Sequence, residues 1–260
     1  MSDAPVSTPA TKPIAEETSL AQDRASIDAT KCDELIEKSI LLIEEKIRSS
    51  GYEVCINRDF YALRDYINSV GAYDSPIFDP DEHDLKTNAL WLQVKSKDGT
   101  TVASHAERAF ECRDFVSEFI ETDRIWFTKG VDIETHKWRT QIHHPSVVLS
   151  GNVSIAGSMF VRKEHRGTGV SLYLPYLSRS IFMRDHKTDW NTGLVRENIL
   201  NSRIPTEYYG YPRTALVFSG TLPRTNSAFT DIHLCWISRQ ESIERLRQLA
   251  NHPRYPIAVE

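Results

Sequence analysis

The stretch Arg166-Gly167-Thr168-Gly169-Val170-Ser171 decides the fold, because it joins an apolar strand-like segment (153–161) to a mostly apolar helical one (172–183). A glycine loop between a strand and a helix presents several free backbone N–H groups in one place. Gly167 and Gly169 have no side chains, so a ligand can approach the main chain closely. The positive end of the following helix dipole lies there too. The stretch therefore predicts a pyrophosphate-binding loop.

Two common phosphate motifs do not fit this spacing. A Walker loop requires a Lys after its second Gly, and none follows Gly169. The dinucleotide motif requires a third Gly at position 172, which is Leu. Arg-x-x-Gly-x-small after a strand ending in Val resembles the Q/R-x-x-G-x-G/A loop of the GNAT superfamily of acyl-CoA-dependent N-acyltransferases. Arg166, Gly169 and Ser171 take its three places, with Ser where Gly or Ala is usual.

The order of the expected elements also resembles a GNAT domain over about residues 88–238. The resemblance implies an α+β (mixed α/β) fold with a central, mostly antiparallel, splayed sheet flanked by helices. The strand before the loop and the strand after its helix would be parallel neighbours that part from each other. Acetyl-CoA, as acyl donor, would enter the split. The residues expected to bind it are Phe160, Val161, Arg166, Gly167, Thr168, Gly169, Val170, Ser171 and Asn198.

The resemblance also implies an acid that protonates the leaving thiolate. The family has Tyr-x-x-x-Gly-Phe, and this chain has Tyr208-Tyr209-Gly210-Tyr211. The register differs, since Thr206 stands four residues before Gly210 and Pro205 interrupts the expected helix. Tyr208 is the first candidate and Tyr209 the second. A tyrosine pKa near 10 keeps the proton on the hydroxyl at neutral pH.

A base is expected on the strand across the cleft. His105 and Glu107 are two residues apart, so both side chains face one side of a strand. Either could take the amine proton, directly or through a water, and a surface pair across two strands is the alternative interpretation. We expect no metal site, because adjacent His143 and His144 would point to opposite faces and no C-x-x-C pair exists.

Composition restricts the classes of protein. The chain has 260 residues, 40% hydrophobic and 26% charged, which is ordinary for a soluble globular protein. Its net charge of −5 argues against a nucleic-acid partner. No apolar run approaches the roughly 20 residues of a membrane span, and no secretory signal is visible. We therefore expect a cytoplasmic protein without a membrane partner, and a homodimer is left open.

Two regions are expected from the patterning. Residues 1–28 are rich in Pro, Ser, Thr, Ala and charge, which predicts a disordered tail. Residues 29–260 are expected to form one domain that begins with N-terminal helices. Apolar residues recur at three- and four-residue steps from Cys32 to Ile47, which predicts an amphipathic helix.

Three functions remain open on these residues. The first is an N-acetyltransferase that moves an acetyl group from acetyl-CoA directly to a primary amine on a small molecule or peptide. The second is a longer-chain N-acyltransferase resembling acyl-homoserine-lactone or N-acyl amino-acid synthases, with an acyl tunnel lined by Trp91, Phe115, Phe119, Trp126 and Phe127. The third is a non-catalytic acyl-CoA-binding module. The acidic loop 79–84 would attract a cationic amine or form a solvated turn.

Overall fold

A seven-stranded sheet forms the centre of the computed structural model, which describes residues 14–128, 139–221 and 229–251, with side chains from residue 30 onward. The strand order is β1-β2-β3-β4-β5-β7-β6, and the β4–β5 pair is parallel whereas the other pairs are antiparallel. The predicted α+β class with a mostly antiparallel sheet is therefore confirmed. The strands are β1 (Glu53–Asn57), β2 (Ala89–Lys95), β3 (Thr101–Cys112), β4 (Gly151–Val161), β5 (Trp190–Arg196), β6 (Arg213–Gly220) and β7 (Thr230–Ser238).

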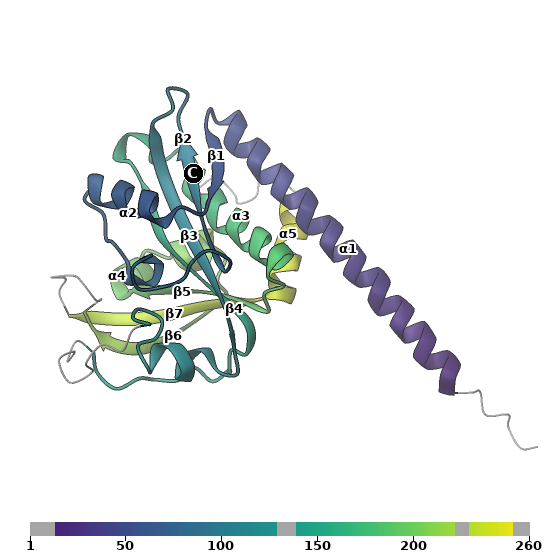
Figure 1. The fold of residues 1–260 in the computed structure, drawn as a ribbon. Coiled ribbons are helices and arrows are strands. Elements are labelled where there is room, and N and C mark those ends of the chain that lie inside the picture. Colours follow the sequence, from purple (N-terminus) through teal and green to yellow (C-terminus); the bar gives the residue numbers. More distant parts are fainter. Residues whose placement is uncertain (1–13, 129–138, 222–228, 252–260) are drawn as a thin grey trace, which may run out of the picture.

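Helices cover both faces of the sheet (Figure 1). One face carries α1 (Ile14–Ser49), α3 (Val170–Asp185) and α5 (Arg239–Asn251), whose apolar side chains pack with those of β2 and β3. The opposite face carries α2 (Phe60–Ser69) and a cluster rich in aromatic side chains. The short helix α4 (Glu197–Asn201) follows β5. Burial of apolar area on both faces is the main force that holds the layers together.

The parallel strands β4 and β5 stay paired over only part of their length. Their register runs from Val153 opposite Trp190 to Ala156 opposite Gly193, and pairing stops there. Beyond that point β4 continues to Val161 beside β3, and β5 continues to Arg196 beside β7. Two strand edges therefore face each other without a shared ladder, which is the splayed pair that the resemblance implied.

Helix α1 begins well before the predicted start at Cys32, and residues 1–13 of the expected tail lie outside the described residues. Residues 14–28 belong to α1 in the structure. No Gly or Pro interrupts 14–49, so nothing in the backbone chemistry ends the helix earlier. Figure 1 shows the N-terminal half of α1 projecting beyond the sheet. That residues 29–260 form a single domain stays a prediction.

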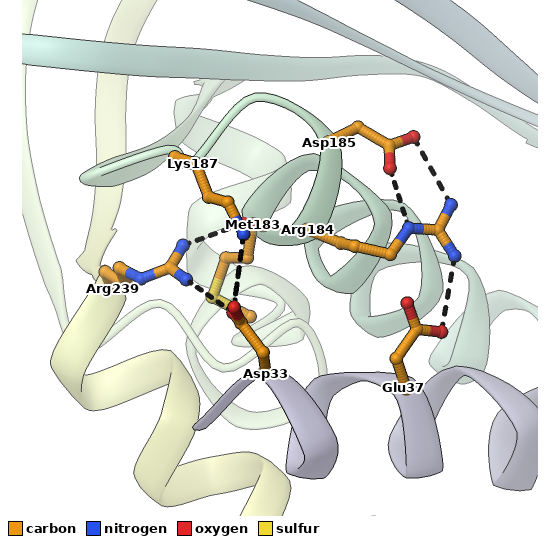
Figure 2. A network of polar contacts seen from close by, with 7 residues as sticks. All are labelled: Asp33, Glu37, Met183, Arg184, Asp185, Lys187 and Arg239. Carbon is orange, nitrogen blue, oxygen red and sulfur yellow. Dashed lines mark hydrogen bonds and ion pairs between the residues drawn. The ribbon is translucent and has the colours of Figure 1, made fainter. Parts of the chain in front are cut away.

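Exposed charges attach the C-terminal half of α1 to the other helices (Figure 2). Asp33 lies 3.3 Å from Lys187 Nζ and 3.7 Å from an Arg239 nitrogen, and Glu37 lies 3.5 Å from Arg184. Arg239 also donates to the Met183 carbonyl at 2.8 Å. We call this group the surface network; its members are Asp33, Glu37, Arg184, Asp185, Lys187 and Arg239.

The sequence did not predict β1, a five-residue edge strand that pairs with β2. Between β3 and β4 the structure has a short π-helical turn, Val116–Ile120, followed by irregular chain packed on the aromatic cluster. Within the described ranges, no helix is both long enough and apolar enough to cross a membrane.

Candidate functional site

A cavity of about 420 Å³ opens where β4 and β5 part. That volume is in the range of small-ligand pockets. The free edges of both strands form its walls, and residues from α3, α4 and the segment after α4 complete it. The lining residues are Tyr73, His105, Ala156, Gly157, Ser158, Met159, Pro175, Gly193, Leu194, Val195, Arg196, Asn198, Ile199, Ile204, Tyr209, Tyr211 and Ile232.

The glycine loop follows the free half of β4 directly. Gly167 has φ +78° and Gly169 has φ +84°, a left-handed conformation that side chains other than glycine adopt at a cost. Gly169 is the N-cap of α3, so the unpaired N–H groups of the first helical turn begin here. Apart from the chain neighbours of Gly167, no atom of the described residues lies within 4 Å of the place that a side chain at this position would occupy. The loop thus leaves an open, anion-compatible concavity at the helix N-terminus.

Arg166, in the same loop, is exposed and donates from Nε to the Val161 carbonyl at 3.2 Å. Arg162 is held differently, because its Nε donates to the Thr101 carbonyl at 2.9 Å. The Arg166 guanidinium therefore keeps donors free beside the loop. This position is suited to a phosphate oxygen.

A bulge interrupts the β3–β4 ladder at the cavity. Ser104 pairs with Phe160 and Ala106 pairs with Gly157, so His105 alone stands opposite two residues of β4. One of them, Ser158, has φ +46°, and its carbonyl accepts from the Ser104 hydroxyl at 3.0 Å. Bulges re-aim backbone and side chains, and here the bulged residue lines the cavity.

His105 reaches the cavity from the face of the sheet that α3 covers. Only 3% of its surface is exposed, so it is not part of a surface pair. Its Nε2 lies 2.9 Å from Ser178 Oγ, and its Nδ1 has no hydrogen-bond partner within the described part of the chain. Burial, assisted by the charge of Arg179, lowers the pKa of His105 from 6.5 to about 3. The imidazole is neutral at neutral pH and has one free ring nitrogen.

Glu107 lies two residues further along β3 and is fully buried beneath the cavity, whose wall it does not reach. Its Oε1 accepts from Asn191 Nδ2 at 2.7 Å. Burial raises the pKa of Glu107, and the nearby Ser178 and Ser154 hydroxyls, the charge of Arg179 and the bond from Asn191 oppose the rise. Its second oxygen, Oε2, is buried and has no hydrogen-bond partner in the described part of the chain.

Asn191 of β5 connects this acid to the far wall of the cavity. Its Nδ2 also donates to Ser154 Oγ at 3.1 Å. Its Oδ1 accepts from Arg179 Nε and from the Tyr211 hydroxyl, each at 2.9 Å. Arg179 donates in addition to a backbone carbonyl, that of Tyr209, at 2.9 Å. We call Glu107, Ser154, Arg179, Asn191 and Tyr211 the buried network.

Three tyrosines lie near the end of the cavity, in different environments. Tyr208, the first candidate acid, ends a π-helical turn (Ile204–Tyr208), is half-buried and is not among the lining residues. Tyr209 and Tyr211 both line the cavity. The Tyr211 hydroxyl is bonded to Asn191, whereas the Tyr209 hydroxyl has no partner among the described residues. Burial raises the pKa of Tyr209 to about 12.

The other predicted positions divide between the cavity and its surroundings. Asn198 is exposed on α4 and lines the cavity. Phe160 and Val161 send their side chains to opposite faces of the sheet, which leaves their backbone on the free β4 edge. In the acidic loop, Asp79 and Asp81 both form ion pairs with Arg64, at 3.4 and 2.6 Å. That loop therefore carries a partly compensated charge.

Sequence reasoning missed Ser178, Arg179 and Asn191. The signal in the sequence was the polar run Ser178-Arg179-Ser180 inside an apolar helix, where all three residues are buried. Buried polar groups need partners, so such a run predicts a hydrogen-bonded layer beneath it. Within the described ranges, no three His, Cys, Asp or Glu side chains gather as a metal ion would require.

No family model and no curated protein matches the chain. Similar solved structures include Arabidopsis thaliana NAA60 in complex with acetyl-CoA, with a TM-score of 0.43 and 10% identity, covering 72% of this chain and 99% of that one. Spermidine N-acetyltransferase from Vibrio cholerae, in complex with CoA and spermine, has a TM-score of 0.43 and 9% identity, covering 75% and 99%. An acetyltransferase of the GNAT family from Streptococcus pneumoniae has a TM-score of 0.40 and 11% identity, covering 72% and 99%. At these identities and TM-scores the likeness assigns no activity to this chain, which has to be judged from its own residues.

Proposed function

We propose that this chain is a GNAT-type N-acetyltransferase that moves an acetyl group from acetyl-CoA directly to a primary amine. The observation that carries the proposal is the cavity at the β4–β5 split, because the free half of β4 leads straight into the glycine loop. A ligand with a pyrophosphate at one end and an extended amide-bearing arm fits both features. The loop suits the pyrophosphate, and the open strand edge suits the arm.

The donor would be held mainly by backbone groups. The N–H groups of Gly167 to Ser171 and the Arg166 guanidinium would bind the pyrophosphate. The amides of the arm would pair with the β4 edge at Phe160 and Val161, as an added strand does. Asn198, on the other wall, would supply a further polar contact.

The reaction needs one group to take a proton and another to give one. When bound, acetyl-CoA supplies the thioester whose C–S bond breaks as the new C–N bond forms. His105 Nδ1, free and neutral at the cavity, is our candidate acceptor of the amine proton. For the proton that the sulfur takes, we favour the Tyr209 hydroxyl over Tyr208, because Tyr209 lines the cavity and no residue in the described ranges competes for its hydroxyl.

A short acyl group is favoured by the packing of the aromatic side chains. The five aromatics expected for a long acyl tunnel do not line this cavity. Trp91, Phe115 and Trp126 are at most 1% exposed and belong to the hydrophobic core. We therefore retain acetyl as the acyl group, and the long-chain and non-catalytic hypotheses become outcomes of the test.

The test is calorimetric titration with acetyl-CoA, free CoA and palmitoyl-CoA, using the wild type and two variants. Gly169→Glu places bulk and negative charge at the loop, so acetyl-CoA affinity should fall at least about 100-fold, a loss of about 3 kcal/mol. Gly99→Glu is the matched control, because Gly99 lies in the β2–β3 turn with almost the same φ, +83°, and its position, like that of Gly169, has room for a side chain without a close contact. The Gly99→Glu variant introduces the same backbone strain as Gly169→Glu and should bind acetyl-CoA with the affinity of the wild type.

Each result decides between the hypotheses. Preference for palmitoyl-CoA would favour the longer-chain enzyme. Binding of acetyl-CoA without acetylation of any amine in a broad panel would favour the non-catalytic module. Equal binding by the wild type and Gly169→Glu would show that the loop does not hold the pyrophosphate.

A further inference from the structure

A positive charge without a partner lies on the wall of the cavity. Arg196, the last residue of β5, lines the cavity and is half-buried. No residue in the described ranges forms a hydrogen bond or an ion pair with its guanidinium. By contrast, Arg179 is bonded to Asn191, and Arg213 pairs with Glu241. A half-buried guanidinium with free donors is suited to a bound anion.

The strand geometry places Arg196 on the face of the sheet opposite α3. Side chains alternate along a strand, and Leu194 packs on the aromatic cluster whereas Val195 packs on the other side. Arg196 therefore shares its face with Leu194 and with Ile232, the residue opposite it on β7. His105 reaches the same cavity from the α3 face. The cavity is thus lined from both faces of the sheet, at the point where β4 and β5 part.

The cavity wall offers no counterpart for a second positive charge on the acceptor. Among the described residues that line the cavity, none is an Asp or a Glu. Glu107 lies beneath the wall, and the acidic loop 79–84 is not part of it. A polyamine would bring a further ammonium group to a wall that carries a guanidinium, which is unfavourable. Much of the wall is apolar, through Leu194, Ile199, Ile204 and Ile232.

We propose that the acceptor is a small apolar amine that also carries a carboxylate, and that Arg196 binds this carboxylate; the proposal rests on the proposed acetyl transfer. The amine reaches His105 Nδ1 through the β4–β5 split, while the carboxylate stays on the other face of the sheet, against Arg196. A guanidinium can donate two parallel hydrogen bonds to one carboxylate, which orients the acceptor as well as binding it. Amino acids with an apolar side chain combine these features.

Calorimetry with analogues of the product tests the proposal without turnover. The protein is saturated with free CoA and then titrated with N-acetyl-leucine or with N-acetyl-leucinamide, which lacks the negative charge. In the wild type the carboxylate should bind at least about 10-fold more tightly than the amide, as expected for hydrogen bonds to a charged group. In Arg196→Met the two affinities should become nearly equal. Equal affinities in the wild type, or no binding of either compound to a protein that binds CoA, would overturn the proposal.

The same variant separates the two anions that this site could meet, the carboxylate of the acceptor and the phosphates of CoA. Arg196→Met should leave the affinity for free CoA unchanged. A fall in CoA affinity, with the preference for N-acetyl-leucine retained, would assign Arg196 to the donor and overturn the proposal. Failure of the wild type to bind CoA would contradict the proposed function, and the acceptor proposal with it, so the two kinds of failure can be told apart.

Turnover with leucine, leucinamide and 1,4-diaminobutane as acceptors gives the second measurement. Leucine should have the highest kcat/KM, and Arg196→Met should lower that value at least about 10-fold, mainly by raising KM. Arg196→Lys keeps the charge and should restore part of the loss. Arg203→Met is the matched control, since Arg203 pairs with Glu207 and does not line the cavity. Its kcat/KM should match that of the wild type. A preference for the diamine, or equal losses in both methionine variants, would overturn the proposal.

Discussion

The buried network and the surface network both contain arginines and carboxyl groups, but they differ in how much of these side chains is exposed to solvent. Arg179 and Glu107 are 2% and 0% exposed, whereas the side chains of Asp33 and Lys187 in the surface network are 51% and 59% exposed. Water screens exposed charges, so such pairs contribute about 0–1 kcal/mol each. Buried charges are hardly screened, and removing one partner is costly. The same residue types are therefore expected to contribute differently to the free energy of unfolding in the two networks.

The two networks also connect different parts of the fold. The surface network fastens α1 to α3 and α5 (Figure 2). None of its members is among the residues that line the cavity. The buried network joins β3, β4, β5 and α3 with the Tyr209–Tyr211 segment, which is a wall of the cavity. We infer that the first network stabilises the position of a helix, and that the second fixes the shape of the proposed site.

The largest effect is expected for Arg179→Met. The variant leaves the Tyr209 carbonyl without its donor and removes the cation near Glu107. We expect a loss of about 3–5 kcal/mol in the free energy of unfolding, measured by urea denaturation. Adding Glu107→Gln, which removes the second ionisable group, should recover part of the loss. A loss below about 1 kcal/mol in the single variant would make the buried network no more important than the surface one.

The fold was predictable to a large extent because its main signals are local. Two glycines with positive φ, preceded by an apolar strand, indicated both the loop and the helix after it. The hairpin of β2 and β3 is also a local feature, because a short turn joins two strands that are neighbours in the sequence. Strand β1 was missed because it has only five residues and lies at the sheet edge, where no clear alternation of apolar and polar residues is required.

The candidate site was less predictable because its residues meet only in three dimensions. His105 and Glu107 were found from their spacing on one strand, but Arg179 and Asn191 come from a helix and a strand after the loop. Their contacts depend on the β4–β5 register, which local patterns do not contain. The choice of Tyr208 over Tyr209 had no local signal behind it either, because the π-helical turn around Pro205 decides which tyrosine faces the cavity.

A second prediction uses pH, because the buried region should respond to acid through His105. The folded-state pKa of about 3 is below the ordinary 6.5, so between these values the unfolded chain binds more protons. The contribution of the neutral His105 imidazole to the free energy of unfolding is fully present above about pH 6.5 and is lost as the pH falls towards 3. Between pH 7 and pH 5 this one group should cost about 2 kcal/mol.

His105→Gln should remove that acid-dependent loss, as measured by urea denaturation at the two pH values. His83 is a useful companion, since burial lowers its pKa to about 4 on the opposite face of the sheet. His83→Gln should remove a similar but separate part of the acid dependence. An unchanged pH slope in His105→Gln would mean that this imidazole is not buried and neutral in solution.

The smallest effect is expected in the surface network, for Asp33→Asn. The variant removes the charge that pairs with Lys187 and Arg239 across two helices. Because these side chains are solvated, the loss should stay below about 1 kcal/mol at low salt and vanish near 1 M salt, where the Debye length is about 3 Å. Glu45→Gln is the control, since Glu45 lies on the same helix but pairs with Arg48 of that helix. A larger, salt-independent loss for Asp33→Asn than for Glu45→Gln would mean that α1 is fastened by a desolvated contact, and the contrast between the two networks would fail.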